Sequence, residues 1–119
     1  MTKQTGMIAI FALGLFSAFG SAYAKSPDEM AKEISASTGK SVRPGATPEQ
    51  IADYLKAHNF YPSPYARKSR RLSGYSMYMR DGRFTADPLQ AAFGAHVSFT
   101  FDERDRLKGY NVDVEKVGR

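Results

Sequence analysis

Residues 96–117, HVSFTFDERDRLKGYNVDVEKV, alternate apolar with polar side chains on both sides of a charged turn. Alternation with a period of two is typical of a strand with one buried face. The first strand, 96–101, would turn Val97, Phe99 and Phe101 inward, and the turn would occupy residues 102–105. The return over 107–117 would place Tyr110, Val112 and Val114 on its apolar face, so this region predicts two antiparallel strands.

The same period extends upstream over residues 73–80. Tyr75 and Met77 would point to one side and Ser76 and Tyr78 to the other. Asp81-Gly82 predicts a two-residue hairpin turn, with a returning strand that starts at 83–85 and is interrupted by Asp87-Pro88. Residues 89–95 are ambiguous, so the pattern predicts an antiparallel meander of three or four strands.

Two helices are predicted before these strands. Ser26-Pro27-Asp28-Glu29 and Thr47-Pro48-Glu49-Gln50 each combine a capping residue, a proline in the first turn and an acid or amide that closes a capping box. The first helix should end at Gly39, and its weakly apolar face suggests that it packs loosely or frays. The second should end near Asn59.

A loop should follow over 59–65, because Pro62 and Pro64 exclude a helix and a central strand. Helices separated from a meander predict an α+β domain, with two short N-terminal helices packed on one face of the sheet. The expected core residues are Ile51, Leu55, Val97, Phe99, Phe101, Val112 and Val114.

Residues 1–24 have the features of a secretory signal peptide. Lys3 precedes an apolar run of 14 residues over 7–20, and Ala22-Tyr23-Ala24 is a small-x-small cleavage site. The run is shorter than the roughly 20 residues that span a bilayer, which disfavours the alternative of a retained membrane anchor. We therefore expect a single domain over 25–119, with no transmembrane segment, in the periplasm or secreted. The chain has no cysteine, so Lys25 cannot be lipidated and no disulfide supports the fold.

The charge is unevenly distributed along the chain. The whole sequence has 17 Lys and Arg against 12 Asp and Glu, and removal of the signal peptide leaves 16 against 12. The acids lie towards the two ends of the mature chain, whereas the middle is basic. Between Tyr54 and Ala86, Asp81 is the one acid. The cations in this range are Lys56, Arg67, Lys68, Arg70, Arg71, Arg80 and Arg83.

Catalytic groups are scarce. His58 and His96 are the only histidines; His58 should be packed or half-exposed on its helix, and His96 should face solvent. No serine lies in a nucleophile elbow. Asp102 and Asp105 lack calcium-loop spacing and alternate with Arg104 and Arg106, which favours a solvated turn. We expect a protein that is not an enzyme and needs no cofactor or metal.

Tyrosine alternates with arginine in the basic middle, and both residue types are enriched at interface hot spots. We expect a contact surface for a protein or an anionic component of the envelope. Nucleic acid is disfavoured by export, and a merely solvated loop is the competing interpretation. An inhibitor or immunity-type protein that blocks an enzyme is the first functional alternative, and a small enzyme is the second. The candidate contact residues are Tyr61, Tyr65, Arg67, Lys68, Arg70, Arg71, Tyr75, Tyr78, Arg80 and Arg83.

Two segments resemble a known family. Residues 42–51, VRPGATPEQI, and 97–107, VSFTFDERDRL, are similar to the opening and the late hairpin of the SmpA/OmlA-type (BamE-like) small envelope proteins. The resemblance spans about 42–114 and implies the helix-then-meander architecture of the β-lactamase-inhibitor-like fold, with a role in outer-membrane assembly. The chain departs from the family at 59–62, where members usually have Gly and Pro, and in lacking the cysteine that the best-known members lipidate.

Overall fold

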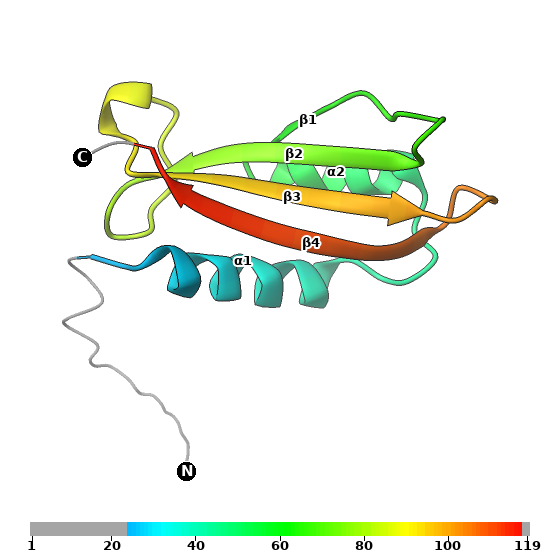
Figure 1. Ribbon diagram of the computed structural model, residues 1–119, viewed down its shortest axis with the longest axis horizontal. Helices are drawn as coiled ribbons and strands as arrows, with labels where there is room; N and C mark the ends of the chain where they lie inside the picture. The colour runs from blue at the N-terminus through cyan, green and yellow to red at the C-terminus, as the bar shows by residue number, and fades with distance from the viewer. Residues whose placement is uncertain (1–23, 118–119) are drawn as a thin grey trace, which may run out of the picture.

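The computed structural model describes residues 24–117, which form two α-helices and a four-stranded antiparallel sheet (Figure 1). The strands lie in the order β1-β2-β3-β4, so the predicted α+β fold with a meander is confirmed. The predicted signal peptide lies outside the described residues, except for Ala24. The elements are α1 (Pro27–Ser41), α2 (Pro48–Ala57), β1 (Tyr61–Pro62), β2 (Arg71–Tyr78), a 3-10 helix (Pro88–Gln90), β3 (Phe93–Phe101) and β4 (Leu107–Lys116).

Both helices begin where the sequence predicts, and for the predicted reason. The Ser26 hydroxyl accepts from the Glu29 amide and the Glu29 carboxylate accepts from the Ser26 amide, and Thr47 and Gln50 repeat this arrangement at α2. The chain leaves α2 through Asn59, whose φ of 66° lets the Phe60 amide donate to the Leu55 carbonyl. These local contacts fix the limits of α2.

The first helix differs from its prediction. It continues to Ser41 instead of ending at Gly39, and the expectation of loose packing or fraying is wrong because Met30, Ile34 and Thr38 are buried. It lies along β4, where a Cβ atom on Gly39 would come within 3.0 Å of the Tyr110 hydroxyl oxygen. Gly39 therefore allows a close contact between helix and strand, and that contact supports the last turn.

The inner face of the sheet carries the core. Val97 and Phe99 are fully buried and Phe101 nearly so, as predicted, and they join Ile51 and Leu55 in one cluster. Of the expected core, Val112 and Val114 are only partly buried, because β4 lies at the edge of the sheet. Both helices contribute to this cluster, and within residues 24–117 no helix covers the opposite face of the sheet, which we call the outer face.

The predicted hairpin after β2 is only partly correct. The chain turns at Arg80-Asp81-Gly82, where Gly82 has a φ of 91°, but the loop has three residues and not two. Phe84 forms a single bridge to Tyr78, so 83–85 is not a strand. Asp87-Pro88 then leads into the 3-10 helix, and the chain crosses to the other edge of β2. The strand that pairs with β2 at this other edge is β3, which begins at Phe93, within the ambiguous segment 89–95.

The predicted loop over 59–65 contains a short strand. Tyr61 pairs with Tyr75 and Pro62 with Gly74, so β1 forms one edge of the sheet. An edge is the position in a sheet that tolerates proline, since its missing N–H would face solvent there. Neither helix that the structure describes within 24–117 has the length and apolar character needed to cross a membrane.

Candidate functional site

Two loops meet at one end of the sheet. The β1–β2 loop closes through paired backbone hydrogen bonds between Ala66 and Arg71, and Arg70 adopts a φ of 55° within it. The Arg70 Nη1 atom donates to the Asp102 carbonyl oxygen at 3.1 Å, which ties this loop to the β3–β4 turn. The Tyr65 hydroxyl donates to Asp105 Oδ1 at 2.6 Å and makes a second tie. The two loops therefore form one rigid surface.

The carboxylates of the β3–β4 turn are engaged inside it. Asp102 Oδ1 accepts from the backbone amides of Arg104 and Arg106, and these hydrogen bonds lower the pKa of the Asp102 carboxyl below its ordinary value. The Asp105 carboxylate accepts from Tyr65, and that hydrogen bond raises the pKa of the Tyr65 hydroxyl. Glu103 is exposed. Asp102 thus stabilises the turn and Asp105 joins it to the β1–β2 loop, and neither aspartate forms an ion pair with a basic side chain among residues 24–117.

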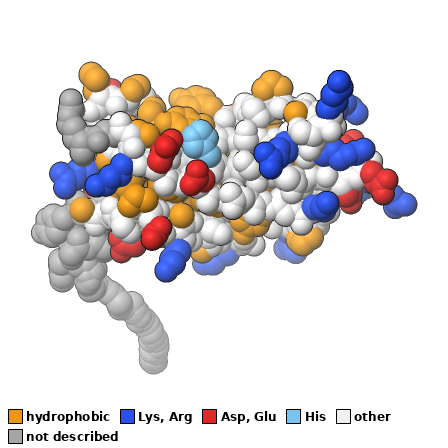
Figure 2. All heavy atoms as spheres, viewed as in Figure 1, with side chains coloured by type: hydrophobic (Ala, Val, Ile, Leu, Met, Phe, Trp, Pro, Cys, Tyr) orange, Lys and Arg blue, Asp and Glu red, His pale blue; other side chains and the backbone are white. Residues whose placement is uncertain are grey.

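Six basic side chains surround this frame, and we call them the basic end. Arg70 is half-buried and the other five are exposed. Figure 2 shows Lys and Arg side chains concentrated around the end of the molecule that carries the β3–β4 turn, with a second group at the opposite end. Within 24–117, the ion pairs are Lys25–Glu33, Arg83–Asp81 and His96–Glu115, so none involves the basic end. The basic end consists of Arg67, Lys68, Arg70, Arg71, Arg104 and Arg106.

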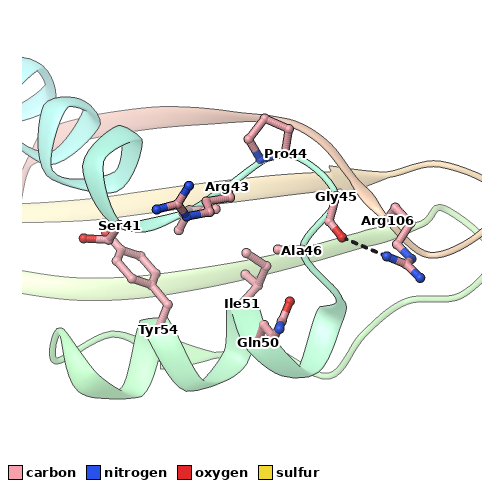
Figure 3. A pocket seen from close by; sticks show the side chains of 10 residues that line it. Ser41, Arg43, Pro44, Gly45, Ala46, Gln50, Ile51, Tyr54 and Arg106 are labelled. Atoms are coloured by element: carbon pink, nitrogen blue, oxygen red, sulfur yellow. Dashed lines mark hydrogen bonds between the residues drawn. The ribbon is translucent and has the colours of Figure 1, made fainter.

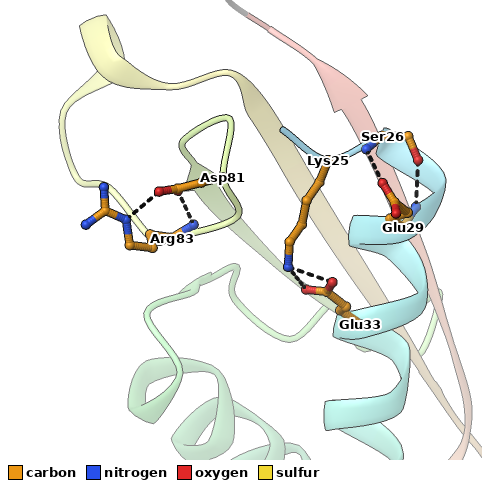
Figure 4. A network of polar contacts seen from close by, with 6 residues as sticks. All are labelled: Lys25, Ser26, Glu29, Glu33, Asp81 and Arg83. Carbon is orange, nitrogen blue, oxygen red and sulfur yellow. Dashed lines mark hydrogen bonds and ion pairs between the residues drawn. The ribbon is translucent and has the colours of Figure 1, made fainter. Parts of the chain in front are cut away.

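Arg80 and Arg83 do not join the other predicted basic residues. Arg71 is the first residue of the eight-residue β2 and Arg80 and Arg83 lie beyond its other end, so the length of the strand, about 23 Å when extended, separates them. Arg83 Nε pairs with Asp81 at 2.7 Å, and the Arg83 backbone amide is the main cause of a lowered pKa at Asp81. Nearby, Lys25 pairs with Glu33 (Figure 4). Lys25 and Arg83 are therefore balanced by acids at this second end, whereas Arg80 forms no ion pair among residues 24–117.

The predicted tyrosines also separate. Tyr65 alone belongs to the basic end, and its ring packs edge-on against Phe101 with centroids 5.3 Å apart. Tyr61 is 62% exposed and lies beside Tyr75 at the β1 edge. Tyr78 turns to the inner face between Phe60 and Phe84, and burial raises the pKa of its hydroxyl. The ten predicted residues thus do not form one continuous surface.

The histidines lie apart from each other. His96 is exposed on the outer face, as predicted, with its ring 4.7 Å from that of Tyr75 and its Nε2 atom 4.0 Å from Glu115. The expectation that His58 is packed or half-exposed is wrong, because it is exposed at the end of α2, where Nδ1 lies 3.0 Å from the Tyr54 carbonyl oxygen. Among residues 24–117, no three His, Cys, Asp or Glu side chains are grouped so as to hold a metal ion.

A hollow of about 510 Å³ opens beside the basic end (Figure 3). Its walls are the end of α1, the connection 42–46 and the first turns of α2, and Arg106 closes one side. Arg43 lies on the connection at one side of the hollow (Figure 3). Pro44, Ala46 and Tyr54 supply the accessible apolar lining, because Ile51 and Val42 are buried. Arg106 therefore belongs to both the hollow and the basic end.

Sequence reasoning missed three of these arginines. The sequence pattern presents Arg104 and Arg106 as evidence against a calcium site and as part of the resemblance over 97–107, and Arg43 as part of the resemblance over 42–51, but none of them as a contact residue. A signal did exist, since alternating Asp and Arg in a tight turn leaves arginines exposed once the aspartates accept backbone amides. Comparisons of the chain with family models, curated proteins and solved structures find no match.

Proposed function

We propose that this chain is an exported, non-enzymatic binding protein of the bacterial envelope that docks on an anionic partner through the basic end. The observation that carries the proposal is the grouping of six basic side chains from two separate loops without a carboxylate partner among residues 24–117. Export rests on the signal peptide predicted over 1–24.

Electrostatics favours a partner at this surface. Like charges held on neighbouring loops repel one another and create a positive potential that an anionic surface relieves. Arginine forms bidentate pairs with carboxylate and phosphate groups, which makes five arginines at the basic end well suited to an acidic partner. The acids of the β3–β4 turn, Asp102, Glu103 and Asp105, offset part of this charge, but six cations against three acids leave an excess of three positive charges at this end.

Rigidity adds to the case for binding. The bonds from Arg70 to Asp102 and from Tyr65 to Asp105 hold the loops in place before a partner arrives. A preformed surface loses less conformational entropy on association than a flexible loop does. The same argument favours docking over a merely solvated basic loop.

The decisive experiment removes charge without disturbing the frame. Arg67, Lys68, Arg71 and Arg104 are exposed, and replacing these four by Ser spares Arg70, which holds the turn. We expect the tagged four-residue variant to capture about tenfold less of the envelope partners than the parent chain does. Capture by the parent chain should also fall as salt is raised, because exposed charges are screened over about 8–10 Å.

A matched control removes the same charge elsewhere. Lys32, Lys40, Arg80 and Lys116 are exposed and lie outside the basic end, so their replacement by Ser should leave capture unchanged. If the control weakens capture as much as the basic-end variant does, net charge alone drives binding and the proposed surface is wrong. A single soluble enzyme captured in place of an envelope component would favour the inhibitor alternative.

A further inference from the structure

The hollow beside the basic end combines the groups of a binding pocket. Ligand pockets of roughly 300–1,000 Å³ typically pair an apolar surface with a few converging polar groups. Here the apolar floor that a ligand can reach consists of Pro44, Ala46 and Tyr54, and the polar groups around it include Arg43, Arg106 and Gln50. Its volume of about 510 Å³ lies within that range. No Asp or Glu is among the lining residues, all of which the structure describes.

The walls are fixed by contacts within the fold. The Gly45 amide donates to the Leu107 carbonyl at 3.1 Å and the Leu107 amide to the Ala46 carbonyl at 2.8 Å, which holds the connection against the start of β4. The hydroxyls of Thr38 and Tyr54 lie 2.9 Å apart and join α1 to α2. The hollow therefore exists before any ligand binds.

Both arginines are free to bind an anion. Arg43 and Arg106 lie to either side of Gly45 in Figure 3, and neither forms an ion pair within 24–117. The one hydrogen bond from the Arg106 guanidinium reaches the Gly45 carbonyl at 3.5 Å, the limit of such a contact. Of the two aspartates in the turn, Asp102 accepts the Arg104 and Arg106 backbone amides and Asp105 accepts the Tyr65 hydroxyl.

We propose that this hollow binds an acidic peptide segment of the protein partner, with carboxylates at Arg43 and at Arg106 and a neighbouring apolar side chain on Pro44, Ala46 and Tyr54. The inference rests on the proposed docking function and specifies its partner chemically. Continuity supports it, because Arg106 links the hollow to the basic end and an acidic segment could cover both.

The lining favours a peptide over a lipid headgroup. The Gln50 carbonyl oxygen already accepts the Thr47 amide at 3.0 Å, which leaves the Gln50 NH₂ group to donate to a peptide carbonyl. The Ser41 hydroxyl at the opposite wall can donate or accept. A single apolar side chain suits the small floor, whereas an acyl chain would run out of the hollow into water.

Three labelled peptides test the recognition on the chain from Lys25 onward, which contains the described domain. One alternates Leu with Glu, one alternates Leu with Gln and one alternates Ser with Glu, all capped at both ends. By fluorescence anisotropy, we expect the Leu-Glu peptide to bind at least about tenfold more tightly than either of the others, since it alone supplies both the carboxylate and the apolar side chain.

Two variants locate the binding. Replacing Arg43 and Arg106 by Ser should weaken Leu-Glu binding by about tenfold or more, while removing the exposed cations Lys32 and Arg80 should change it by less than about twofold. Ser41→Phe fills the mouth of the hollow without a change of charge and should also weaken binding. Ala36→Phe, on an exposed position of the same helix, is its control.

Several results would overturn the inference. Equal binding of the Ser-Glu peptide would mean plain charge attraction, and equal binding of the Leu-Gln peptide would mean that no carboxylate is recognised. Failure of every peptide, with Arg43-dependent binding to phosphatidylglycerol vesicles, would assign the hollow to a lipid phosphate. Failure of the proposed function would give a different result. The four-residue basic-end variant keeps Arg43 and Ser41, so it should still bind the peptide. If it also still captured envelope partners, the proposed function would be wrong while the inference about the hollow would stand.

Discussion

Replacement of Gly74 by Ala tests the packing of α2 on the sheet. Gly74 lies on the inner face of β2, and a Cβ atom built there would be 2.7 Å from Leu55 Cδ2 and 3.1 Å from Leu55 Cδ1. Contacts below 3.0 Å essentially do not occur for Cβ atoms, so something must move. Leu55 is 0% exposed, so its methyl groups can move only by displacing neighbouring core side chains or by a shift of α2 away from the sheet.

The expected cost follows from two opposing effects. Overpacking a core typically destabilises the folded state by about 1–3 kcal/mol. Against this, replacing Gly by Ala within a strand reduces the entropy of the unfolded chain and contributes about 0.5–1 kcal/mol of stability. We expect a net loss of about 1–2 kcal/mol in the free energy of unfolding, which lowers the melting temperature by about 4–8 °C for each kcal/mol.

Urea or thermal unfolding followed by far-ultraviolet circular dichroism measures this loss, and a second glycine provides the control. Gly109 lies on the outer face, where the nearest atom to a new Cβ would be Thr100 Oγ1 at 4.0 Å. Gly109→Ala should therefore leave stability unchanged or raise it by up to about 1 kcal/mol.

A double-mutant cycle with Leu55→Ala isolates the clash. Leu55→Ala alone should cost about 2–5 kcal/mol, because it opens a cavity in the core. In that background the Gly74→Ala substitution should cost little, since the clashing methyl groups are gone. An equal penalty in both backgrounds, or a Gly74→Ala variant as stable as the parent chain, would refute the close approach of α2 to β2.

Three further predictions concern the core, the turn and the leader. Phe99→Ala should cost about 3–5 kcal/mol because the ring is fully buried, and a loss below about 1 kcal/mol would contradict the strand register. Asp102→Asn keeps an acceptor oxygen but loses the charge that lowers the pKa of Asp102. The parent chain should therefore melt higher at neutral pH, and the difference should shrink as pH falls below about 4, through the lowered pKa, as thermal melts at several pH values would reveal. Mass spectrometry of the chain from its native compartment should find Lys25 as the first residue without lipid, and an intact Met1 would contradict export.

The features that sequence predicted well are those set by neighbouring residues. A capping box involves positions three residues apart, so Ser26 and Thr47 identified both helix starts without knowledge of the fold. Alternation over 97–101 determined which side chains of β3 are buried, because a strand must expose alternate residues to opposite faces.

The features that sequence missed depend on distant contacts. Gly39 resembles a terminator when read locally, but in the fold its missing side chain makes room for the Tyr110 hydroxyl. The segment 83–85 follows a good turn, yet the neighbour of β2 on its other edge is β3, which begins at Phe93. In both cases tertiary packing overrides a signal that is correct in isolation.

The candidate site illustrates the same limit more strongly. A count of charge along the chain groups Arg80 and Arg83 with Arg67, but an extended strand carries them to opposite ends of the sheet. Arg104 comes instead from a turn far along the chain, brought beside the β1–β2 loop by the hydrogen bond between Tyr65 and Asp105, which are 40 residues apart. Composition can therefore indicate that a chain carries a basic surface, whereas only the pairing of β2 with β3 determines which cations share it, because that pairing places the two loops at the same end of the sheet.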